Sequence, residues 1–416
     1  MTGRLVILGS GETAPTMVEV HRGDLAATGA GPALLLDTPY GFQENADDIT
    51  EKALAYFGRN VGRTVTPLTW RVPLEGPALD RALAAVRSAR WVFAGPGSPT
   101  YAMRVWAGSG LTEAVRDLVT GGGTATFASA AAVTVGAVTV PVYEVYKCGA
   151  DPFWAPGTNL LRELAGLHAA VIPHYDNAEG GTHSTHYCYL GERRLRVLEA
   201  QLPDGAHVIG VDEHTALVLD LATGTAQVLG RGGVTVRRDG GSRVLPAGTC
   251  VPITELSKAR AGGSPATLTE MNPTPAPGQL AASPPALSLR EVADHAQRRF
   301  TSALADRNAD TAATTALGLE QALADWSADS LQSDDADHAR RVLRGMVLAL
   351  AEAARDGLVD PRERLEPLVS ALIEHRNAAR AHHDFTAADA LRDQLAAAGV
   401  EVRDGPDGSV WSLHTV

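Results

Sequence analysis

The chain has 416 residues, 45% of them apolar, which is enough for two or three domains with substantial cores. Its formal net charge of −12 argues against a broad surface for nucleic acid or for an anionic membrane. The three cysteines are far apart and form no CxxC pair, so neither a disulfide framework nor a cysteine-rich zinc site is indicated. No apolar run approaches the roughly 20 residues of a membrane span, and the N-terminus shows no signal-peptide pattern, so we expect a cytoplasmic protein.

The first 120 residues alternate short apolar runs with segments of helical period. The runs predict buried strands at 4–8, 32–36, 64–68 and 91–94, and the periodic segments predict helices at 46–58, 77–90 and 111–120. Strands that alternate with helices favour a mostly parallel, flavodoxin-like α/β sheet. Pro67 places its strand at an edge of the sheet or at a strand end.

Residues 121–136 are the candidate for a catalytic turn. Three glycines lead into a β-prone segment, Ser129 follows among alanines, and small apolar residues continue at helical spacing. This pattern predicts a strand, a sharp turn that carries Ser129, and a helix whose N-terminus offers free N–H groups. Polar residues at 9–12 and 95–98 also end predicted strands, and parallel sheets hold their sites at such ends. We therefore predict a serine nucleophile; the alternative is a buried serine in an alanine-rich packing segment.

The pattern becomes antiparallel after the turn. One strand is predicted within 167–177, and glycine-containing turns separate further strands at 208–219, 225–229, 234–236 and 243–245. We expect these strands to form an antiparallel addition that closes a first domain at 1–256.

The C-terminal part has a different composition. Residues 257–287 are rich in Pro, Ala, Ser and Gly and predict a linker. From residue 288 onward, helical period predicts an all-α second domain at 288–416. Its helices are expected at 289–306, 310–328, 334–356, 361–381 and 384–398, followed by a short hairpin at 400–411.

A serine nucleophile needs a base within hydrogen-bond reach and an acid that orients the base. His174 is the best base because it sits at a predicted strand end, and His183, His186 and His214 are its competitors. A metal site is not favoured at His183 and His186, because their loop lacks a paired helical histidine motif.

Two carboxylates compete for the role of the acid. Glu144 lies in an otherwise apolar, strand-like run at 141–147, where an isolated carboxylate needs a partner. Glu213 ends the segment Gly-Val-Asp-Glu. Either residue could instead be paired with an arginine.

Further residues are candidates for the oxyanion hole and the substrate pocket. The oxyanion donors are predicted to be the N–H of Ala130 and an N–H from the loop at Gly97 and Ser98. Candidate substrate-binding residues are Glu12, Tyr101, Tyr175, Asn177 and Arg193.

Several of these motifs, in this order, resemble the cyanophycinase and aspartyl-dipeptidase family of serine peptidases. Within residues 3–250 they are Gly-Ser-Gly-Glu, Gly-Pro-Gly-Ser-Pro-Thr-Tyr, Ala-Ser-Ala-Ala-Ala, Ile-Pro-His-Tyr and Gly-Val-Asp-Glu. The resemblance implies a class I glutamine-amidotransferase-like α/β fold. It also implies hydrolysis of peptide or isopeptide bonds next to acidic residues, without metal or cofactor, on a peptide-like or acidic small substrate. In that family the triad runs Ser, acid, His, which selects Ser129, Glu144 and His174 and favours Glu144 over Glu213.

Two positions depart from the pattern of this family. Ala131 stands where the family usually has a glycine, and its Cβ narrows the site. Pro96 removes one N–H donor from a loop that is usually Gly-Gly-Gly-Asn. These departures support the alternative of a catalytically inactive protein that binds a small molecule or a peptide.

The last 120 or so residues resemble the end of cysteinyl-tRNA synthetases. The strongest motifs lie at 380–395 and 399–404 and at Trp411, and they imply the helical anticodon-side domain. The chain has no His-Ile-Gly-His, no Lys-Met-Ser-Lys-Ser and no zinc cysteines, so it is not a synthetase. We expect this domain to support homo-oligomerisation or docking. A tRNA-associated protein is the second alternative, although acidic residues outnumber arginines in this domain.

Overall fold

The computed structural model describes residues 3–178, 183–258, 287–327, 335–356, 361–405 and 408–413. The chain divides into two compact units. The α/β unit holds residues 1–288 and 324–334, and the helical unit holds residues 289–323 and 335–416. The linker predicted at 257–287 falls almost wholly on residues 259–286, which lie outside the described residues, so it stays a prediction.

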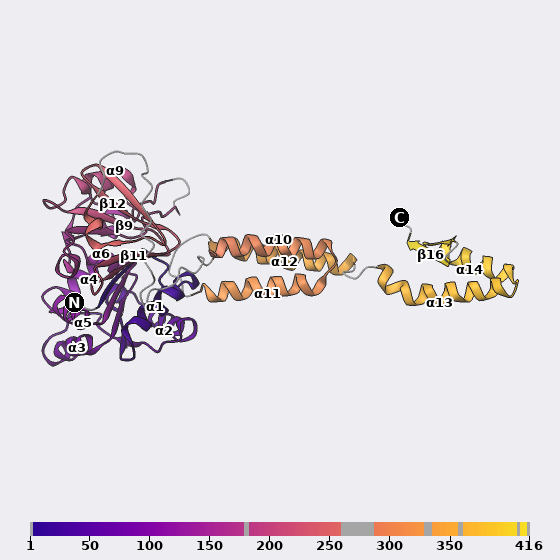
Figure 1. The fold of residues 1–416 in the computed structure, drawn as a ribbon, viewed down its shortest axis with the longest axis horizontal. Coiled ribbons are helices and arrows are strands. Elements are labelled where there is room, and N and C mark those ends of the chain that lie inside the picture. Colours follow the sequence, from indigo (N-terminus) through magenta and orange to yellow (C-terminus); the bar gives the residue numbers. More distant parts are fainter. Residues whose placement is uncertain are drawn as a thin grey trace. The chain divides into compact units, whose positions relative to one another are not determined.

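Five parallel strands form the larger part of an eight-stranded sheet in the α/β unit. Figure 1 shows this unit in indigo to magenta. In spatial order the five strands are β1 (Arg4–Leu8), β5 (Thr124–Ala128), β4 (Trp91–Ala94), β2 (Ala33–Leu36) and β3 (Thr66–Leu68). Every residue of β2, β4 and β5 is buried, which explains the continuous apolar runs in the sequence. β3 is the outermost strand, as the proline within it predicts.

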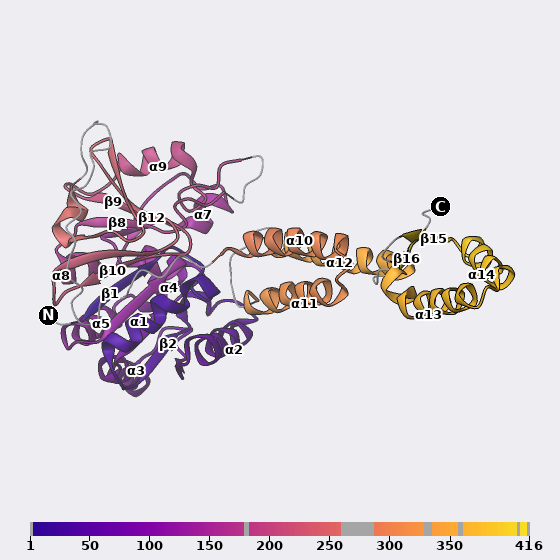
Figure 2. The same ribbon diagram turned by 45° about the vertical axis from the view of Figure 1, so that its right-hand side comes forward.

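Helices pack against both faces of this sheet (Figure 2). Val6 and Leu8 of β1 belong to one core, with α1 (Val18–Thr28) and α2 (Ala46–Tyr56). Leu5 and Ile7 belong to the opposite core, with α3 (Gly76–Ser88) and α5 (Leu111–Thr120). The other helices of the unit are α4 (Pro99–Trp106), α6 (Ser129–Thr134), α7 (Val142–Tyr146), α8 (Leu160–Ala165) and α9 (Gly191–Glu199).

Antiparallel strands extend the first sheet beyond β1 and help to build a second sheet. The extension consists of β10 (Thr215–Asp220), β11 (Thr225–Gly230) and β14 (Cys250–Pro252). The second sheet has the order β13 (Gly241–Pro246), β12 (Gly233–Arg238), β9 (His207–Val211) and β8 (Ala169–Ile172). A small separate sheet pairs β6 (Val138–Thr139) with β7 (Ala155–Pro156).

The predicted fold class, a mostly parallel α/β sheet with an antiparallel addition and a C-terminal helical region, is confirmed. Two predicted elements are wrong. The strand-like run at 141–147 contains the short helix α7. The single strand expected at 208–219 is interrupted at residues 212–214, where the chain passes from β9 in the second sheet to β10 in the first.

The helical unit contains α10 (Leu289–Ala305), α11 (Ala309–Asp325), α12 (Asp335–Asp356), α13 (Pro361–Ala381) and α14 (Phe385–Ala397), followed by strands β15 (Val400–Gly405) and β16 (Gly408–Leu413). These elements match the predicted helices and hairpin to within a few residues. Arg376 on α13 is buried and makes two hydrogen bonds of 2.8 Å to Asp404 on β15, next to a small core that contains Trp411. Of the helices that the structure describes, none has both the length and the apolar character needed to cross a bilayer.

Candidate active site

Ser129 lies on a strained turn between β5 and α6. Ala128 is extended, whereas Ser129 has φ 49°, a left-handed conformation that costs a residue with a Cβ on the order of 1 kcal/mol or more. The N–H of Ala131 donates to the carbonyl of Gly95 at 3.2 Å, so the loop after β4 contacts the turn directly. Ala131 is completely buried, which explains why the positions after the serine are small.

His174 comes from the second sheet and reaches the serine. It follows the end of β8 and has φ 48°, and its main-chain N–H donates to the carbonyl of Gly9 at 3.3 Å. Its Nε2 lies 2.8 Å from Oγ of Ser129. The structure therefore brings together the predicted nucleophile and the predicted base.

Glu213 is the carboxylate that contacts this histidine. Its Oε1 lies 2.9 Å from Nδ1 of His174, and Oε1 also accepts a 2.8 Å hydrogen bond from Nδ2 of Asn177. Because an ionised carboxylate only accepts hydrogen bonds, Nδ1 must carry the proton, and Nε2 is left to accept from the serine. Burial opposes ionisation of Glu213, but these hydrogen bonds and the charge of His174 outweigh it and lower the pKa of Glu213.

The assignment of Glu144 as the acid is wrong. Residues 142–146 form the short helix α7 and not a strand, and Oε1 of Glu144 accepts a 2.7 Å hydrogen bond from the hydroxyl of Thr100. The order along the chain is therefore Ser129, His174 and Glu213. The acid that geometry selects is the one the sequence offered as the alternative.

The three residues predicted to supply oxyanion donors have different backbone surroundings. Ala130 is the second residue of α6, so its N–H is one of those for which a helix supplies no acceptor of its own. Gly97 has φ 134°, and a Cβ there would come within 2.1 Å of the carbonyl oxygen of Pro39, so only glycine fits. Ser98 is wrong as a donor, because its N–H already donates to Pro39 at 2.8 Å and its hydroxyl caps α4 by accepting from the N–H of Tyr101.

The N-terminal and C-terminal parts of the chain are similar to different known proteins. Residues 362–411 match the family model of the cysteinyl-tRNA ligase anticodon binding domain. The cysteine–tRNA ligase of Paenarthrobacter aurescens (strain TC1) is 46% identical over 91 residues, which are 20% of this chain and 19% of that protein. That of Beutenbergia cavernae is 36% identical over 124 residues, 27% of this chain and 26% of that protein. The chain thus spans about a fifth to a quarter of the length of these relatives, and the C-terminal resemblance is confirmed.

A crystal structure of a peptidase from an acI-B1 Actinobacterium matches with a TM-score of 0.50 and 20% identity, covering 61% of this chain and 97% of that chain. This share must include much of the α/β unit, because the helical unit makes up less than a third of the chain. The two share a fold. The expected resemblance to peptidases is confirmed at that level.

The predicted substrate-binding residues have different positions. Tyr101 lines a cavity of about 710 Å³, and its hydroxyl donates to the carbonyl of Arg71 at 2.6 Å. Arg193 is exposed on α9, away from any contact that would assign it to the site among the described residues. Glu12 is only 1% exposed, and its carbonyl is 2.7 Å from Nε2 of His21.

Two of the predicted substrate contacts have structural roles instead. Asn177 is completely buried and supports Glu213. Tyr175 is 7% exposed and packs so closely over Gly210 that a Cβ there would lie 2.2 Å from its ring. The structure also shows a supporting residue that the sequence reading missed: Oδ1 of Asp176 accepts from the N–H of Glu213 at 2.7 Å.

The competing histidines are not placed against the serine. His214 has its Nδ1 2.9 Å from the hydroxyl of Thr16, and burial lowers its pKa to about 4. His183 has its Nε2 3.2 Å from the hydroxyl of Tyr146 on α7. His186 is exposed. Within the described part of the chain, no group of three His, Cys, Asp or Glu side chains is arranged to hold a metal ion.

The cavity next to α4 combines aromatic, hydroxyl and charged side chains. It is lined by Phe42, Gln43, Ser98, Thr100, Tyr101, Arg104, Tyr143, Glu144 and Lys147. The Arg104 guanidinium lies 4.8 Å from the centre of the Tyr101 ring, and the Lys147 ammonium lies 5.2 Å from that of Tyr146. The cavity therefore offers exposed cations and hydroxyl groups from the start of α4.

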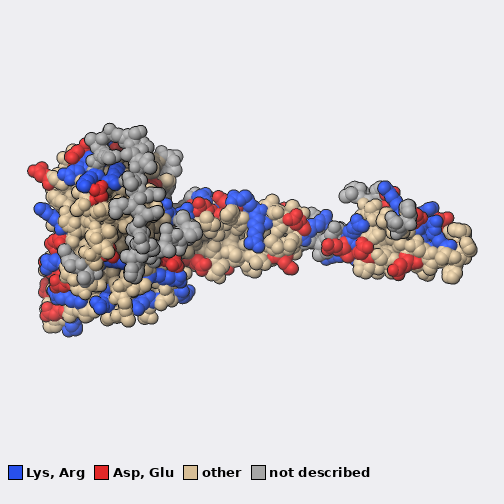
Figure 3. Space-filling view, in the orientation of Figure 1, with Lys and Arg blue, Asp and Glu red and all other residues tan. Residues whose placement is uncertain are grey.

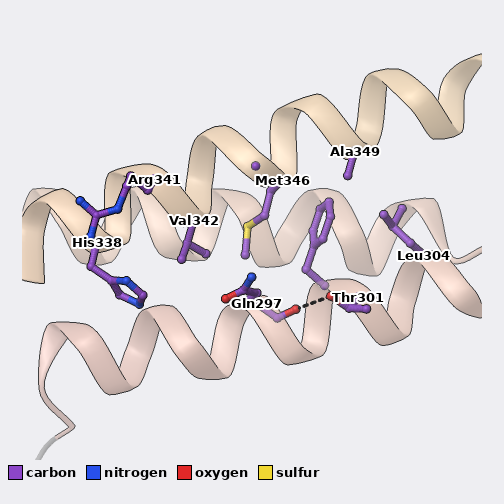
Figure 4. A pocket seen from close by; sticks show the side chains of 10 residues that line it. Gln297, Thr301, Leu304, His338, Arg341, Val342, Met346 and Ala349 are labelled. Atoms are coloured by element: carbon purple, nitrogen blue, oxygen red, sulfur yellow. Dashed lines mark hydrogen bonds between the residues drawn. The ribbon is translucent and has the colours of Figure 1, made fainter.

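The helical unit has a cavity of about 520 Å³ between α10 and α12 (Figure 4). Phe300, Leu304, Val342 and Met346 give it an apolar lining, while His338 lies at one end and is 2.7 Å from Oδ1 of Asp294 through its Nε2. Gln297, Thr301 and Arg341 add polar groups to this lining.

Proposed function

We propose that the α/β unit is a serine-type hydrolase that cleaves amide bonds in peptide-like substrates. The observation that carries the proposal is the continuous chain from Oγ of Ser129 through the imidazole of His174 to the carboxylate of Glu213, with contacts of 2.8 and 2.9 Å. The strained conformation of Ser129 supports it, because such strain persists mainly where function requires it. The peptidase that shares this fold suggests the class of substrate.

In the proposed mechanism, Nε2 of His174 takes the proton of Ser129 while Oγ attacks the amide carbonyl carbon. The N–H of Ala130, and that of Gly97 as a second candidate donor, stabilise the oxyanion of the tetrahedral intermediate. His174 then gives its proton to the leaving nitrogen, and the C–N bond breaks. Water attacks the resulting ester by the same route, and the acid product leaves Ser129 free. Glu213 keeps the imidazole in the required tautomer and stabilises its charged form.

The exposed cations at the cavity add to this proposal. Arg104 and Lys147 can meet a carboxylate of the substrate, in agreement with a peptide-like or acidic small molecule. No cofactor is needed for this chemistry.

Covalent labelling tests the proposal. An uncharged fluorophosphonate is added to the full chain, to Ser129→Ala and to the matched control Ser184→Ala, and the intact mass of each protein is then measured. The control changes an exposed serine. We expect one adduct on the parent chain and on Ser184→Ala, and none on Ser129→Ala. If the parent chain takes no adduct, the hydrolase proposal fails and a binding protein that retains the cavity becomes the better explanation.

A second candidate function rests on the match of residues 362–411 to an anticodon binding domain, which suggests contact with tRNA. Against it, Arg376 and Arg380 both pair with Asp404, and both charge signs are interspersed on the face in Figure 3. Binding of tRNA by the full chain should weaken steeply with salt and should be lost in a chain that stops at residue 287. Absence of binding at low salt leaves docking or oligomerisation as the proposed role of the helical unit.

A further inference from the structure

Glu144 is a carboxylate without a role in the triad, and its two oxygens differ. Oε1 accepts the 2.7 Å hydrogen bond from Thr100. Oε2 is shielded from solvent and has no hydrogen-bond partner among the residues that the structure describes. A buried oxygen of this kind is costly unless a donor satisfies it, and Glu144 lines the cavity described above.

A chain of hydrogen bonds fixes the orientation of this carboxylate. The hydroxyl proton of Thr100 goes to Glu144, so the oxygen of Thr100 must accept the 3.0 Å bond from Ser98. The oxygen of Ser98 accepts in turn from the N–H of Tyr101, at 3.2 Å, in the first turn of α4. Each hydrogen bond in this series donates in the direction of Oε1 of Glu144, so Oε2 remains as the acceptor for a ligand.

The other charged side chains of the cavity are exposed. Arg104 and Lys147 are exposed, whereas Glu144 is half-buried. The half-buried carboxylate of Glu144 therefore suits a positive group of a ligand, while the exposed Arg104 and Lys147 suit a negative one.

The elements that line the cavity are connected to the serine turn and to His174 through neighbouring residues. The loop that leads to Ser98 starts at Gly95, which accepts from the N–H of Ala131 in the serine turn. On the other side, the ring of Tyr146 on α7 is 4.9 Å from that of Tyr189, and Tyr189 is 6.2 Å from the ring of His174. These contacts link the elements that line the cavity with the turn of Ser129 and with His174.

We propose that Glu144 is a specificity residue that binds a protonated nitrogen of the substrate. The nitrogen is an α-ammonium group or a basic side chain, and it donates to Oε2 while Thr100 holds Oε1. That the ligand is a substrate rests on the hydrolase proposal; that the site binds a cation does not.

Calorimetric titration of the full chain carrying Ser129→Ala tests the site with four small amides. L-argininamide has both cations, N-acetyl-L-argininamide has only the guanidinium, L-citrullinamide has only the ammonium, and N-acetyl-L-citrullinamide has neither. We expect at least one of the cationic amides to bind about tenfold or more tightly than the uncharged one, the size of one charge-assisted hydrogen bond. The two singly charged compounds identify which nitrogen binds.

Glu144→Gln should reduce this preference to near unity, and Glu163→Gln, which changes a glutamate on α8, should retain it. Thr100→Val keeps the carboxylate but removes its hydrogen bond, so it should give an intermediate preference. Equal binding of all four amides, no binding of any, or a preference that survives Glu144→Gln would overturn the proposal. None of these outcomes depends on labelling of Ser129, so failure of the cation site and failure of the hydrolase remain distinguishable.

Discussion

Replacement of Glu213 by Gln tests the choice of acid most sharply. The change preserves size but removes the charge 2.9 Å from Nδ1 of His174. At an effective dielectric constant of about 20, two unit charges at that separation attract by about 6 kcal/mol. This energy is similar to the rise in activation free energy, about 5.4 kcal/mol or roughly 10⁴-fold in rate, that is expected when the acid of a triad is replaced by an amide. The second-order rate constant for fluorophosphonate labelling of Ser129 should fall by a factor approaching that value.

Glu163→Gln is the matched control, because it changes a half-exposed glutamate whose nearest cation, on Arg116, is 3.5 Å away. Its labelling rate should stay within about twofold of that of the parent chain. Circular dichroism of all variants separates a catalytic loss from unfolding. If Ser129 of Glu213→Gln is labelled within a factor of ten of the parent rate, Glu213 is not the acid.

Three further outcomes are expected. Asn177→Leu removes a donor to Glu213, so the pKa of that carboxylate should rise, and the acidic limb of the labelling rate should move to higher pH in a pH profile. Burial raises the pKa of Asp24 to about 7, and the charge of Arg4 partly offsets this rise. Folding therefore favours the protonated carboxyl group. Its contribution to the free energy of unfolding is complete below about pH 4 and is lost as the pH rises through 7. Asp24→Asn should therefore abolish a decline of up to about 4 kcal/mol over that range, measured by unfolding followed through tryptophan fluorescence, and an unchanged pH slope would contradict this. Arg376→Met should destabilise the β15–β16 hairpin by about 1–3 kcal/mol, because it breaks two hydrogen bonds to the partly exposed Asp404. The amides of the hairpin should then exchange hydrogen faster. Unchanged exchange would show that the ion pair contributes little.

The sequence predicted the parallel half of the sheet well because burial on both faces leaves continuous apolar runs, as in β2, β4 and β5. It also predicted that Ser129 and His174 follow strand ends, which is a local property. The amphipathic period of the long helices likewise gave their positions to within a few residues. These features depend on neighbouring residues in the chain and can be read from them.

The position of Glu213 could not be predicted in the same way, because it depends on where the chain passes from one sheet to the other. Glu213 sits where β9 ends and β10 begins, but the apolar residues on both sides made 208–219 look like one strand. The run around Glu144 has too few residues to separate a short helix from a strand, and the family order favoured it. For Ser98 a local signal was present: a serine followed by a proline is typical of the start of a helix, which α4 confirms.

In the proposed triad, the serine follows a strand of the first sheet, the histidine follows a strand of the second, and the acid lies between the strands β9 and β10 that belong to the two sheets. The proposed hydrolytic activity should therefore arise late in synthesis, because Ser129 leaves the ribosome long before residues 207–213 complete the proposed site. Two fragments divided near residue 158, after the serine helix and before β8, should each be inert. Mixing them would then report on docking of the sheets, which makes the protein suitable for a split-enzyme design.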